Sequence, residues 1–396
     1  MAYPLVRIKR GKEQSILRKH PWVFSGAIHS ISEDLEEGAL VAVCNSDEEI
    51  LGVGHFAMGS IAVRILSFEN STLNAVFFES RLRKAWQKRQ TVKLVNHSET
   101  NLFRWVHAEG DELPGLIIDW YNGVAVIQCH SIGMFKQLPL ISKAIQAILG
   151  SSLKAIYNKS KETIPTPYKA TCENGYVFEQ VTTPHQAKEN GHVFNIDWVN
   201  GQKTGFFIDQ RDNRAYLAQL AKDKKILNTF CYSGGFSIYA LNAGAKEVHS
   251  LDSSASAIQL VEDNIAQNPT PGLHKSFVAN ALDFLKDDAT PNDYDIIVLD
   301  PPAFAKSIKN KHKAVQGYKR LNKLGLNKIK SGGLLFTFSC SQVIDLPLFI
   351  NTLRAAAIES KRSISILNIL HQASDHPINL YHPESEYLKG LVLIVN

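Results

Sequence analysis

From about residue 190 onward, the chain alternates short apolar runs with stretches of helix length. The apolar runs read KILNTF, EVHSLD, KSFVAN, YDIIVLD and GLLFTFSC, and segments such as SASAIQLVEDNIAQN separate them. This alternation is typical of the α/β class, in which helices join the strands of a doubly wound parallel sheet. Ligands of such sheets bind beyond the carboxyl ends of the strands. Functional residues are therefore expected directly after each predicted strand.

The ends of the first two strands indicate a nucleotide-like cofactor. Gly234 and Gly235 allow a tight turn into a helix whose N-terminal amides can face a ligand. An ordinary strand-to-helix turn is the alternative. The second strand ends at Asp252, whose carboxylate can accept hydrogen bonds from ribose hydroxyls or can cap the next helix. Tyr232 and Asn228 lie in or beside the glycine loop and are further candidates for cofactor contact.

The fourth strand is followed by Asp300, Pro301 and Pro302, and the prolines keep the backbone extended. An Asp-Pro-Pro-aromatic sequence at this place resembles the substrate-base signature of class I methyltransferases. This resemblance implies that S-adenosylmethionine is the cofactor and that Asp300, which also borders the cofactor site, holds a nucleobase edge together with the prolines. Phe304 is then a candidate to stack on a base taken out of its helix.

Seven motifs together extend the resemblance over nearly the whole chain. They read HPWVFSGAI, GQKTGFFIDQRDNR, NTFCYSGGFS, DPPAF, GYKRLN, FSCS and HQASDHP, and they resemble the ribosomal large-subunit methyltransferase I type, the RlmI-like family. The resemblance implies methyl transfer to C5 of a cytosine in large-subunit ribosomal RNA. It also implies cofactor contact by Gln210 and a loop at Asp375 over the pocket. Asn280 stands where this family often has an aspartate beside the adenine.

The same resemblance implies three domains. Residues 1–70, with strand-like runs such as PLVRIK and IAVRILSF, are expected to form a PUA-like RNA-binding β barrel. Residues 71–188 open on an amphipathic helix and are expected to form a small central α/β domain. Residues 189–396 are expected to form the Rossmann-like methyltransferase domain.

Cys340 ends the fifth strand, in LLFTFSCSQ, and has two interpretations. A strand cysteine is often a small buried hydrophobe. However, C5 of cytosine is a poor nucleophile, and addition of a thiolate to C6 turns C5 into an enamine-like carbon that can take a methyl group. Beside a cofactor loop and Asp300, we interpret Cys340 as the nucleophile. Cys231 is the rival thiol, and its place inside the cofactor loop favours burial.

The distribution of charge suits a polyanionic partner. Residues 7–19 hold six basic side chains and one acid, and no acid occurs from residue 301 to residue 344. That second segment carries Lys306, Lys309, Lys311, Lys313, Lys319, Arg320, Lys323, Lys328 and Lys330. A solvated helix face is the alternative for each cluster, whereas recurrence in separate domains favours phosphate binding by ribosomal RNA or its precursor.

The cysteines and the apolar runs of the sequence indicate the cellular compartment in which the protein works. The five cysteines lie far apart, so neither a disulfide framework nor a metal site is indicated. Without a signal pattern or a run of about 18 uncharged apolar residues, we expect a cytoplasmic protein with no membrane contact. The oligomeric state is open, and a homodimer is one candidate assembly.

Three other functions compete with cytosine-C5 methylation. A methyltransferase acting on a ring nitrogen or an exocyclic amine needs no thiol, because nitrogen has its own lone pair. A non-catalytic RNA-binding assembly protein would retain the fold without using the cofactor. A nicotinamide-dependent dehydrogenase is disfavoured by the incomplete glycine pattern and by Asp300-Pro301-Pro302 after the fourth strand.

Overall fold

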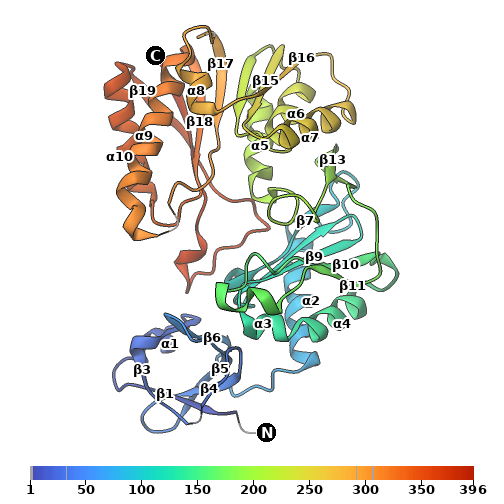
Figure 1. The fold of residues 1–396 in the computed structure, drawn as a ribbon, viewed down its shortest axis with the longest axis vertical. Coiled ribbons are helices and arrows are strands. Elements are labelled where there is room, and N and C mark those ends of the chain that lie inside the picture. The colour runs from blue at the N-terminus through green and yellow to red at the C-terminus, as the bar shows by residue number, and fades with distance from the viewer. Residues whose placement is uncertain (1–2, 33, 291, 306) are drawn as a thin grey trace. The chain divides into compact units, whose positions relative to one another are not determined.

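The structure is a computed structural model that describes residues 3–32, 34–290, 292–305 and 307–396. The chain forms two compact units (Figure 1). Unit 1 contains residues up to 188 together with 196–208 and 374–385, and unit 2 contains 189–195, 209–373 and 386–396. The predicted boundary after residue 70 lies inside unit 1, so the three-domain division stays a prediction.

The first part of unit 1 is a six-stranded sheet with the order β2-β6-β5-β4-β1-β3. Alternating apolar side chains, among them Val6, Val41 and Val63, fill the core around which these strands curve (Figure 1). The elements are β1 (Leu5–Ile8), α1 (Gln14–Leu17), β2 (Trp22–Phe24), β3 (Ile28–Ile31), β4 (Leu40–Cys44), β5 (Ile50–Phe56) and β6 (Ile61–Ser67).

A five-stranded sheet with the order β11-β10-β9-β8-β7 follows in unit 1. Helices α2 and α4 pack together, and a core that includes Trp105 and Phe78 joins helices and sheet. The elements are α2 (Ala75–Thr91), β7 (Leu102–His107), β8 (Leu116–Tyr121), β9 (Val124–Cys129), α3 (Ile132–Lys136), α4 (Leu138–Leu149), β10 (Ala155–Asn158) and β11 (Gly175–Phe178). Strands β12 (His185–Glu189) and β13 (His192–Ile196) form a separate two-stranded sheet.

The segment around Asp375 belongs to the buried interior of unit 1. Asp375 Oδ2 accepts a hydrogen bond of 2.8 Å from Arg104 N, and the Asp375 carbonyl accepts one of 2.8 Å from Arg89 Nη2. Arg89 is itself fully buried and forms a bidentate ion pair with Asp111. The carboxylate and the backbone carbonyl of Asp375 thus anchor residues 374–385 inside unit 1. The expected loop over the pocket stays a prediction.

Unit 2 is built on a seven-stranded sheet with the order β16-β15-β14-β17-β18-β20-β19. The strands are β14 (Lys225–Thr229), β15 (Glu247–Asp252), β16 (Leu273–Val278), β17 (Tyr294–Leu299), β18 (Ile329–Ser339), β19 (Ile364–Leu370) and β20 (Lys389–Val395). The first five confirm the predicted strands and pair in parallel. The sheet is not wholly parallel as predicted, because β20 enters antiparallel between β18 and β19.

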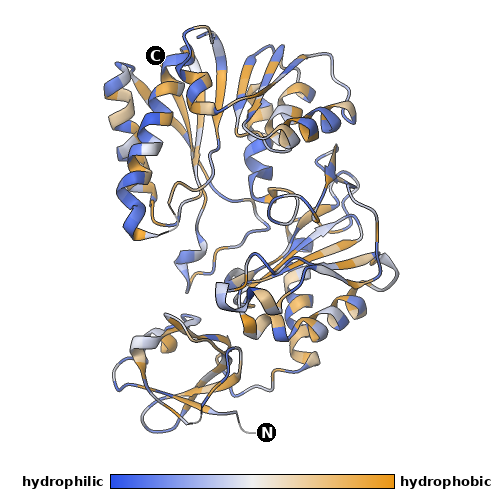
Figure 2. Cartoon of the chain, viewed as in Figure 1, coloured by the Kyte–Doolittle hydropathy of each residue, from blue (hydrophilic) through white to orange (hydrophobic). Residues whose placement is uncertain are grey.

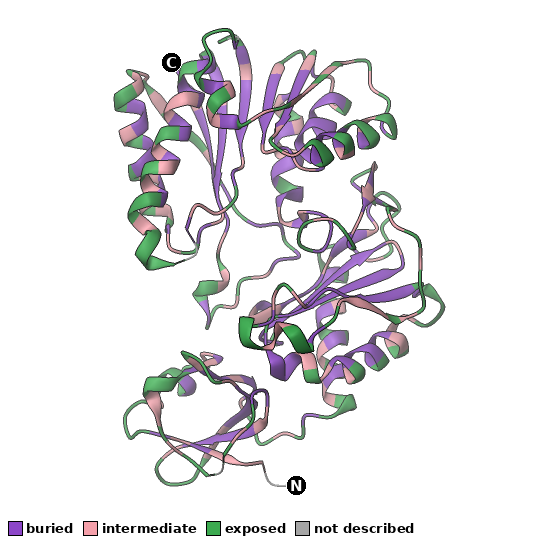
Figure 3. Cartoon of the chain, viewed as in Figure 1, coloured by how far each residue is buried: buried purple, intermediate pink, exposed green. Residues whose placement is uncertain are grey.

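Helices cover both faces of this sheet, so its central strands are buried (Figure 3). One apolar core joins the sheet to α8, α9 and α10, and another joins it to α5 and α6. The helices are α5 (Arg211–Leu220), α6 (Gly235–Asn242), α7 (Ala255–Ala266), α8 (Ala281–Lys286), α9 (Lys311–Lys328) and α10 (Leu346–Ser360). Within the described residues, every helix is too short or too polar to span a bilayer.

Candidate active site

The loop between β14 and α6 has a constrained backbone. Phe230 and Tyr232 adopt positive φ angles of 55° and 45°, and Gly234 adopts 77° as the N-cap of α6. Non-glycine residues in this conformation are strained, and such strain clusters at functional sites. Gly235 is required for packing, because a Cβ atom there would lie 2.9 Å from Cδ of Arg214.

Asp252 ends β15 and holds this loop in place. Its Oδ2 accepts a hydrogen bond of 3.1 Å from Tyr232 N, and its Oδ1 accepts one of 3.0 Å from Ser254 N. Ser254, rather than Asp252, is the N-cap of α7. Each carboxylate oxygen has a further lone pair beyond these bonds, and the side chain is only partly buried. These free acceptor positions fit the donating hydroxyls of a ribose.

The two predicted asparagines differ in exposure. Asn228 is buried, and its amide donates a hydrogen bond of 2.9 Å to Ser237 Oγ, so its contact with the cofactor stays a prediction. Asn280 is exposed and is the N-cap of α8, where its Oδ1 accepts from Leu282 N at 2.9 Å. Its amide NH₂ group is the part left to face an adenine.

Asp300 follows β17 and is held by Gln210. Gln210 Nε2 donates to Asp300 Oδ2 at 3.0 Å, while Gln210 Oε1 accepts from Asn213 Nδ2 at 2.6 Å. Burial raises the pKa of Asp300 to about 7, with a smaller increase from the nearby Asp209 carboxylate, although the Gln210 bond opposes both. Near neutral pH, Asp300 can therefore act as a hydrogen-bond donor as well as an acceptor. Gln210 is placed to orient this acid.

Asp209 was missed in the sequence, although it stands in the motif GQKTGFFIDQRDNR beside Gln210. Its Oδ2 accepts a hydrogen bond of 2.6 Å from the Tyr387 hydroxyl. Its Oδ1 is buried and has no hydrogen-bond partner within the described parts of the chain. The residue thus links the Asp300 side of the site to the segment that leads into β20.

Cys340 follows β18, the strand next to β17. The parallel register pairs Leu299 with Thr337, so Asp300 and Cys340 leave the same edge of the sheet. Ser341 fixes the turn after Cys340, because its Oγ lies 3.0 Å from the Tyr318 hydroxyl and its carbonyl accepts from Lys389 Nζ at 2.8 Å. The structure therefore brings the predicted acid and thiol to neighbouring strand ends.

The first two residues of GYKRLN, Gly317 and Tyr318, explain the placement of Phe304. The Phe304 ring packs against Tyr318 with centroids 4.6 Å apart. A Cβ atom at position 317 would approach the Phe304 ring to 2.9 Å, so Gly317 makes room for it. Phe304 belongs to the partly buried edge of the core. Stacking on a base is thus limited to whatever part of the ring stays accessible, and this role stays a prediction.

The five cysteines differ in exposure, and all five are described. Only Cys340 is not buried. Burial, with a smaller contribution from the Asp252 carboxylate, raises the pKa of the Cys231 thiol well above its usual value. Burial likewise raises the pKa of Cys129 to about 12. Because the thiolate is the reactive form, these buried thiols are poor nucleophiles. Cys340 is the thiol best placed to react.

The basic clusters are smaller than the sequence suggested. In unit 2, Lys319 and Lys323 both pair with Glu359, Lys330 pairs with Asp295, and Lys328 is buried. Lys306 lies outside the described residues. Within residues 307–344, the exposed cations without an ion pair are Lys309, Lys313 and Arg320, in or just before the hydrophilic helix α9 (Figure 2). In unit 1, Arg10, Lys12, Arg18 and Lys19 are exposed.

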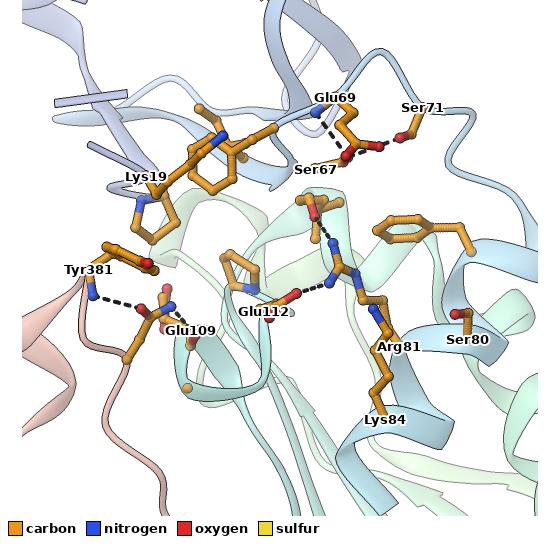
Figure 4. A pocket seen from close by; sticks show the side chains of 18 of the residues that line it. Lys19, Ser67, Glu69, Ser71, Ser80, Arg81, Lys84, Glu109, Glu112 and Tyr381 are labelled. Carbon is orange, nitrogen blue, oxygen red and sulfur yellow. Dashed lines mark hydrogen bonds and ion pairs between the residues drawn. The ribbon is translucent and has the colours of Figure 1, made fainter. Parts of the chain in front are cut away.

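A cavity of about 720 Å³ lies within unit 1 and contains none of the predicted site residues. Figure 4 shows Lys19, Arg81 and Lys84 around it, with Tyr381 at its edge. Arg81 is neutralised by an ion pair with Glu112. Lys19 lies 4.9 Å from the centre of the Phe68 ring. The cavity wall thus combines cations with aromatic rings, next to carboxylates.

Comparisons with known proteins identify the family of this chain. Residues 6–68 match the PUA-like domain family. Ribosomal RNA large subunit methyltransferase I of Alteromonas mediterranea is 37% identical over 391 residues, and that of Shewanella frigidimarina is 37% identical over 395 residues. Each alignment covers 98% of both chains.

Two crystal structures share the fold along the whole chain. One is SMU.776 in complex with SAH, with a TM-score of 0.85 and 22% identity, covering 99% of this chain and 100% of that chain. The other is a protein from Streptococcus mutans, with a TM-score of 0.84, 21% identity and the same coverage. Residues 102–376 match the S-adenosylmethionine-dependent methyltransferase family. Together with the relatives above, this match shows that the chain belongs to the ribosomal RNA large subunit methyltransferase I family of S-adenosylmethionine-dependent enzymes.

Proposed function

We propose that this enzyme forms 5-methylcytosine in large-subunit ribosomal RNA through a covalent bond between Cys340 and C6 of the target cytosine. The observation that carries the proposal is the pairing of a partly exposed thiol, Cys340, with the acid Asp300 at the ends of adjacent parallel strands. The relatives are named as methyltransferases of large-subunit ribosomal RNA, which supports the substrate class.

Methylation at a ring carbon requires a thiol because C5 must first be made nucleophilic. Addition of the Cys340 sulfur to C6 moves electron density toward C5, which becomes a nucleophile. Bound S-adenosylmethionine supplies an electrophilic methyl group. The methylated C5 then loses its proton, and the Cys340 sulfur leaves C6 so that the ring regains its aromatic character. Water takes up this proton.

Asp300 is suited to hold the N3 and amine edge of the cytosine. Negative charge develops on the ring when the sulfur adds, and a positioned donor stabilises that charge. Because the pKa of Asp300 is raised to about 7, mainly by burial, a large fraction of this acid carries a proton near neutral pH. Gln210, through its bond of 3.0 Å to Asp300, keeps the acid in one orientation.

The exposed cations supply a surface for phosphates. Arg10, Lys12 and Arg18 extend from the PUA-like part of unit 1. Lys309 and Lys313 extend from the start of α9 in unit 2. Phosphate contacts of this kind give affinity without reading sequence. They support RNA as the partner and leave the choice of nucleotide to the site around Cys340.

Asp252→Ala tests the cofactor site. Removing the acceptor for ribose hydroxyls is expected to weaken S-adenosylmethionine binding by about 1.5 to 3 kcal/mol, the range for hydrogen bonds to a charged group. Isothermal titration calorimetry measures the change. Asp263→Ala, which removes an exposed acid from α7, is the matched control. Unchanged affinity in folded Asp252→Ala would contradict the assignment.

The function itself is tested with purified enzyme, labelled S-adenosylmethionine and unmodified large-subunit ribosomal RNA. Digestion to nucleosides and mass spectrometry are expected to find the label in 5-methylcytidine. Label in an N-methylated nucleoside would replace the proposal with a nitrogen-directed methyltransferase. RNA binding without any methyl transfer would favour the non-catalytic assembly protein.

A further inference from the structure

We propose that Lys389 is a positioning residue whose buried ammonium group stabilises the thiolate of Cys340. The inference rests on the proposed role of Cys340 as nucleophile. It identifies the group that keeps the sulfur in its reactive form, since the thiolate and not the thiol adds to carbon. Lys389 begins β20, the antiparallel strand that the sequence did not predict.

The strand register places Lys389 beside the end of β18. Lys389 pairs with Ser339 in the antiparallel ladder, one residue before Cys340. Its side chain turns toward the chain after Cys340, where Nζ donates a hydrogen bond of 2.8 Å to the Ser341 carbonyl. A second bond of 2.6 Å reaches the Tyr387 carbonyl. The ammonium group is therefore held against the segment that carries the thiol.

The charge of Lys389 is not neutralised by a direct ion pair within the described part of the chain. Lys389 is 4% exposed, and the two groups that accept its hydrogen bonds are neutral carbonyl groups. Burying a cation without an anion is unfavourable, so an anion that forms nearby is stabilised in return. Two of the three N–H groups are used, which leaves one to face an anion.

The titratable groups around this position support the assignment. Burial lowers the pKa of Lys389, whereas the charges of Cys340, Glu386 and Asp345 act in the opposite direction. Tyr318 faces the same turn, and burial raises the pKa of its phenol, so it stays neutral and does not compete as an anion. The thiol proton passes to solvent, while Lys389 keeps its own three protons.

The test is the pH dependence of Cys340 alkylation by iodoacetamide, followed by mass spectrometry of the Cys340 peptide. The wild-type thiol is expected to titrate below the ordinary cysteine pKa of about 8.5. Lys389→Gln is expected to raise this value by at least about one unit and to slow alkylation at pH 7 by about tenfold. Methyl transfer should fall in parallel and recover as the pH is raised.

Two variants separate the charge from its structural setting. Lys389→Arg keeps the charge and is expected to restore a low thiol pKa. Lys328→Gln is the matched control, because Lys328 is also buried and donates to two carbonyl groups, at 2.8 and 2.9 Å, but lies just before the opposite end of β18. It should leave the alkylation profile unchanged.

An unchanged alkylation profile in folded Lys389→Gln would overturn the inference. If that variant does not fold, the alkylation profile of the wild-type protein tests the inference. A wild-type Cys340 pKa at or above about 8.5 would then overturn the inference. The readout needs no RNA, so it is independent of the proposed function. Methylation by Cys340→Ser would refute the nucleophile, whereas a low thiol pKa that depends on Lys389 would stand.

Discussion

Cys340→Ser is expected to reduce methyl transfer by a factor on the order of 10³ or more, because the hydroxyl is far less readily ionised than the thiol it replaces. The substitution changes one partly exposed atom at the end of β18, so binding of S-adenosylmethionine and RNA should remain. Single-turnover methyl transfer, with binding measured separately by calorimetry, gives the comparison.

The same variant distinguishes a covalent mechanism from a merely structural thiol. RNA with 5-fluorocytidine at the target position should form a lasting adduct with the wild-type protein, because fluorine does not leave C5 as a proton does. Cys340→Ser should form no adduct, whereas Cys231→Ser should still be trapped because Cys231 is buried. Methylation by Cys340→Ser at a near wild-type rate would point to a nitrogen-directed reaction.

The parts of the site that sequence reasoning found share a local signal. Asp252, Asp300 and Cys340 each interrupt or directly follow an apolar run, and parallel strands bring such positions to one edge. The period of the pattern, together with the turn at Gly234, was therefore enough to predict the strands and which residues stand at their carboxyl ends, whereas the roles of these residues stay predictions. The family resemblance added Gln210, which donates a hydrogen bond to Asp300 and whose contact with the cofactor stays a prediction.

The parts that were missed depend on contacts between distant segments. Lys389 lies beside the end of β18 only because β20 pairs with β18. The sequence indicates this position only by a lysine at the start of an apolar run. The bond of Asn228 to Ser237 on α6 depends on the packing of a helix against its strand. The burial of Asp375 depends on Arg89 and Arg104, some 270 residues earlier in the chain. The cofactor contact of Asn228 and the loop of Asp375 over the pocket both stay predictions. Neither the hydrophobic periodicity nor the spacing of motifs can predict such contacts between distant segments.

Asp300→Asn is expected to have opposite effects on activity and on stability. Activity should fall about 10²-fold, because an asparagine amide can still donate but cannot release or take up a proton at the cytosine edge as the carboxyl can. The Gln210 bond can persist, because an asparagine carbonyl also accepts from Gln210 Nε2. Steady-state methyl transfer measures the first effect, and chemical denaturation at two pH values measures the second.

The stability effect follows from the raised pKa. The folded-state pKa of Asp300 is about 7, while an unfolded aspartate titrates near about 3.9. As the pH rises between these values, the folded protein retains a proton that the unfolded chain has released, so the carboxyl progressively lowers the free energy of unfolding. A shift of about 3 units sets an upper limit on the order of 4 kcal/mol, and residual solvent contact reduces it. Asp300→Asn should therefore be more stable than wild type by about 1 to 3 kcal/mol at pH 8, relative to the difference at pH 4.

Asp295→Asn, on the same strand, is the matched control for that measurement. Burial alone would raise the pKa of Asp295, but hydrogen bonds from Lys225 N and Lys330 Nζ outweigh it, so the net shift is downward. A carboxyl with a lowered pKa stabilises the folded state above its unfolded pKa, and this contribution is lost as the pH falls through the folded value. Asp295→Asn should thus be less stable than wild type at pH 8. If both variants change stability in the same direction between pH 4 and pH 8, Asp300 does not sit in the raised-pKa environment on which its role at the cytosine edge depends.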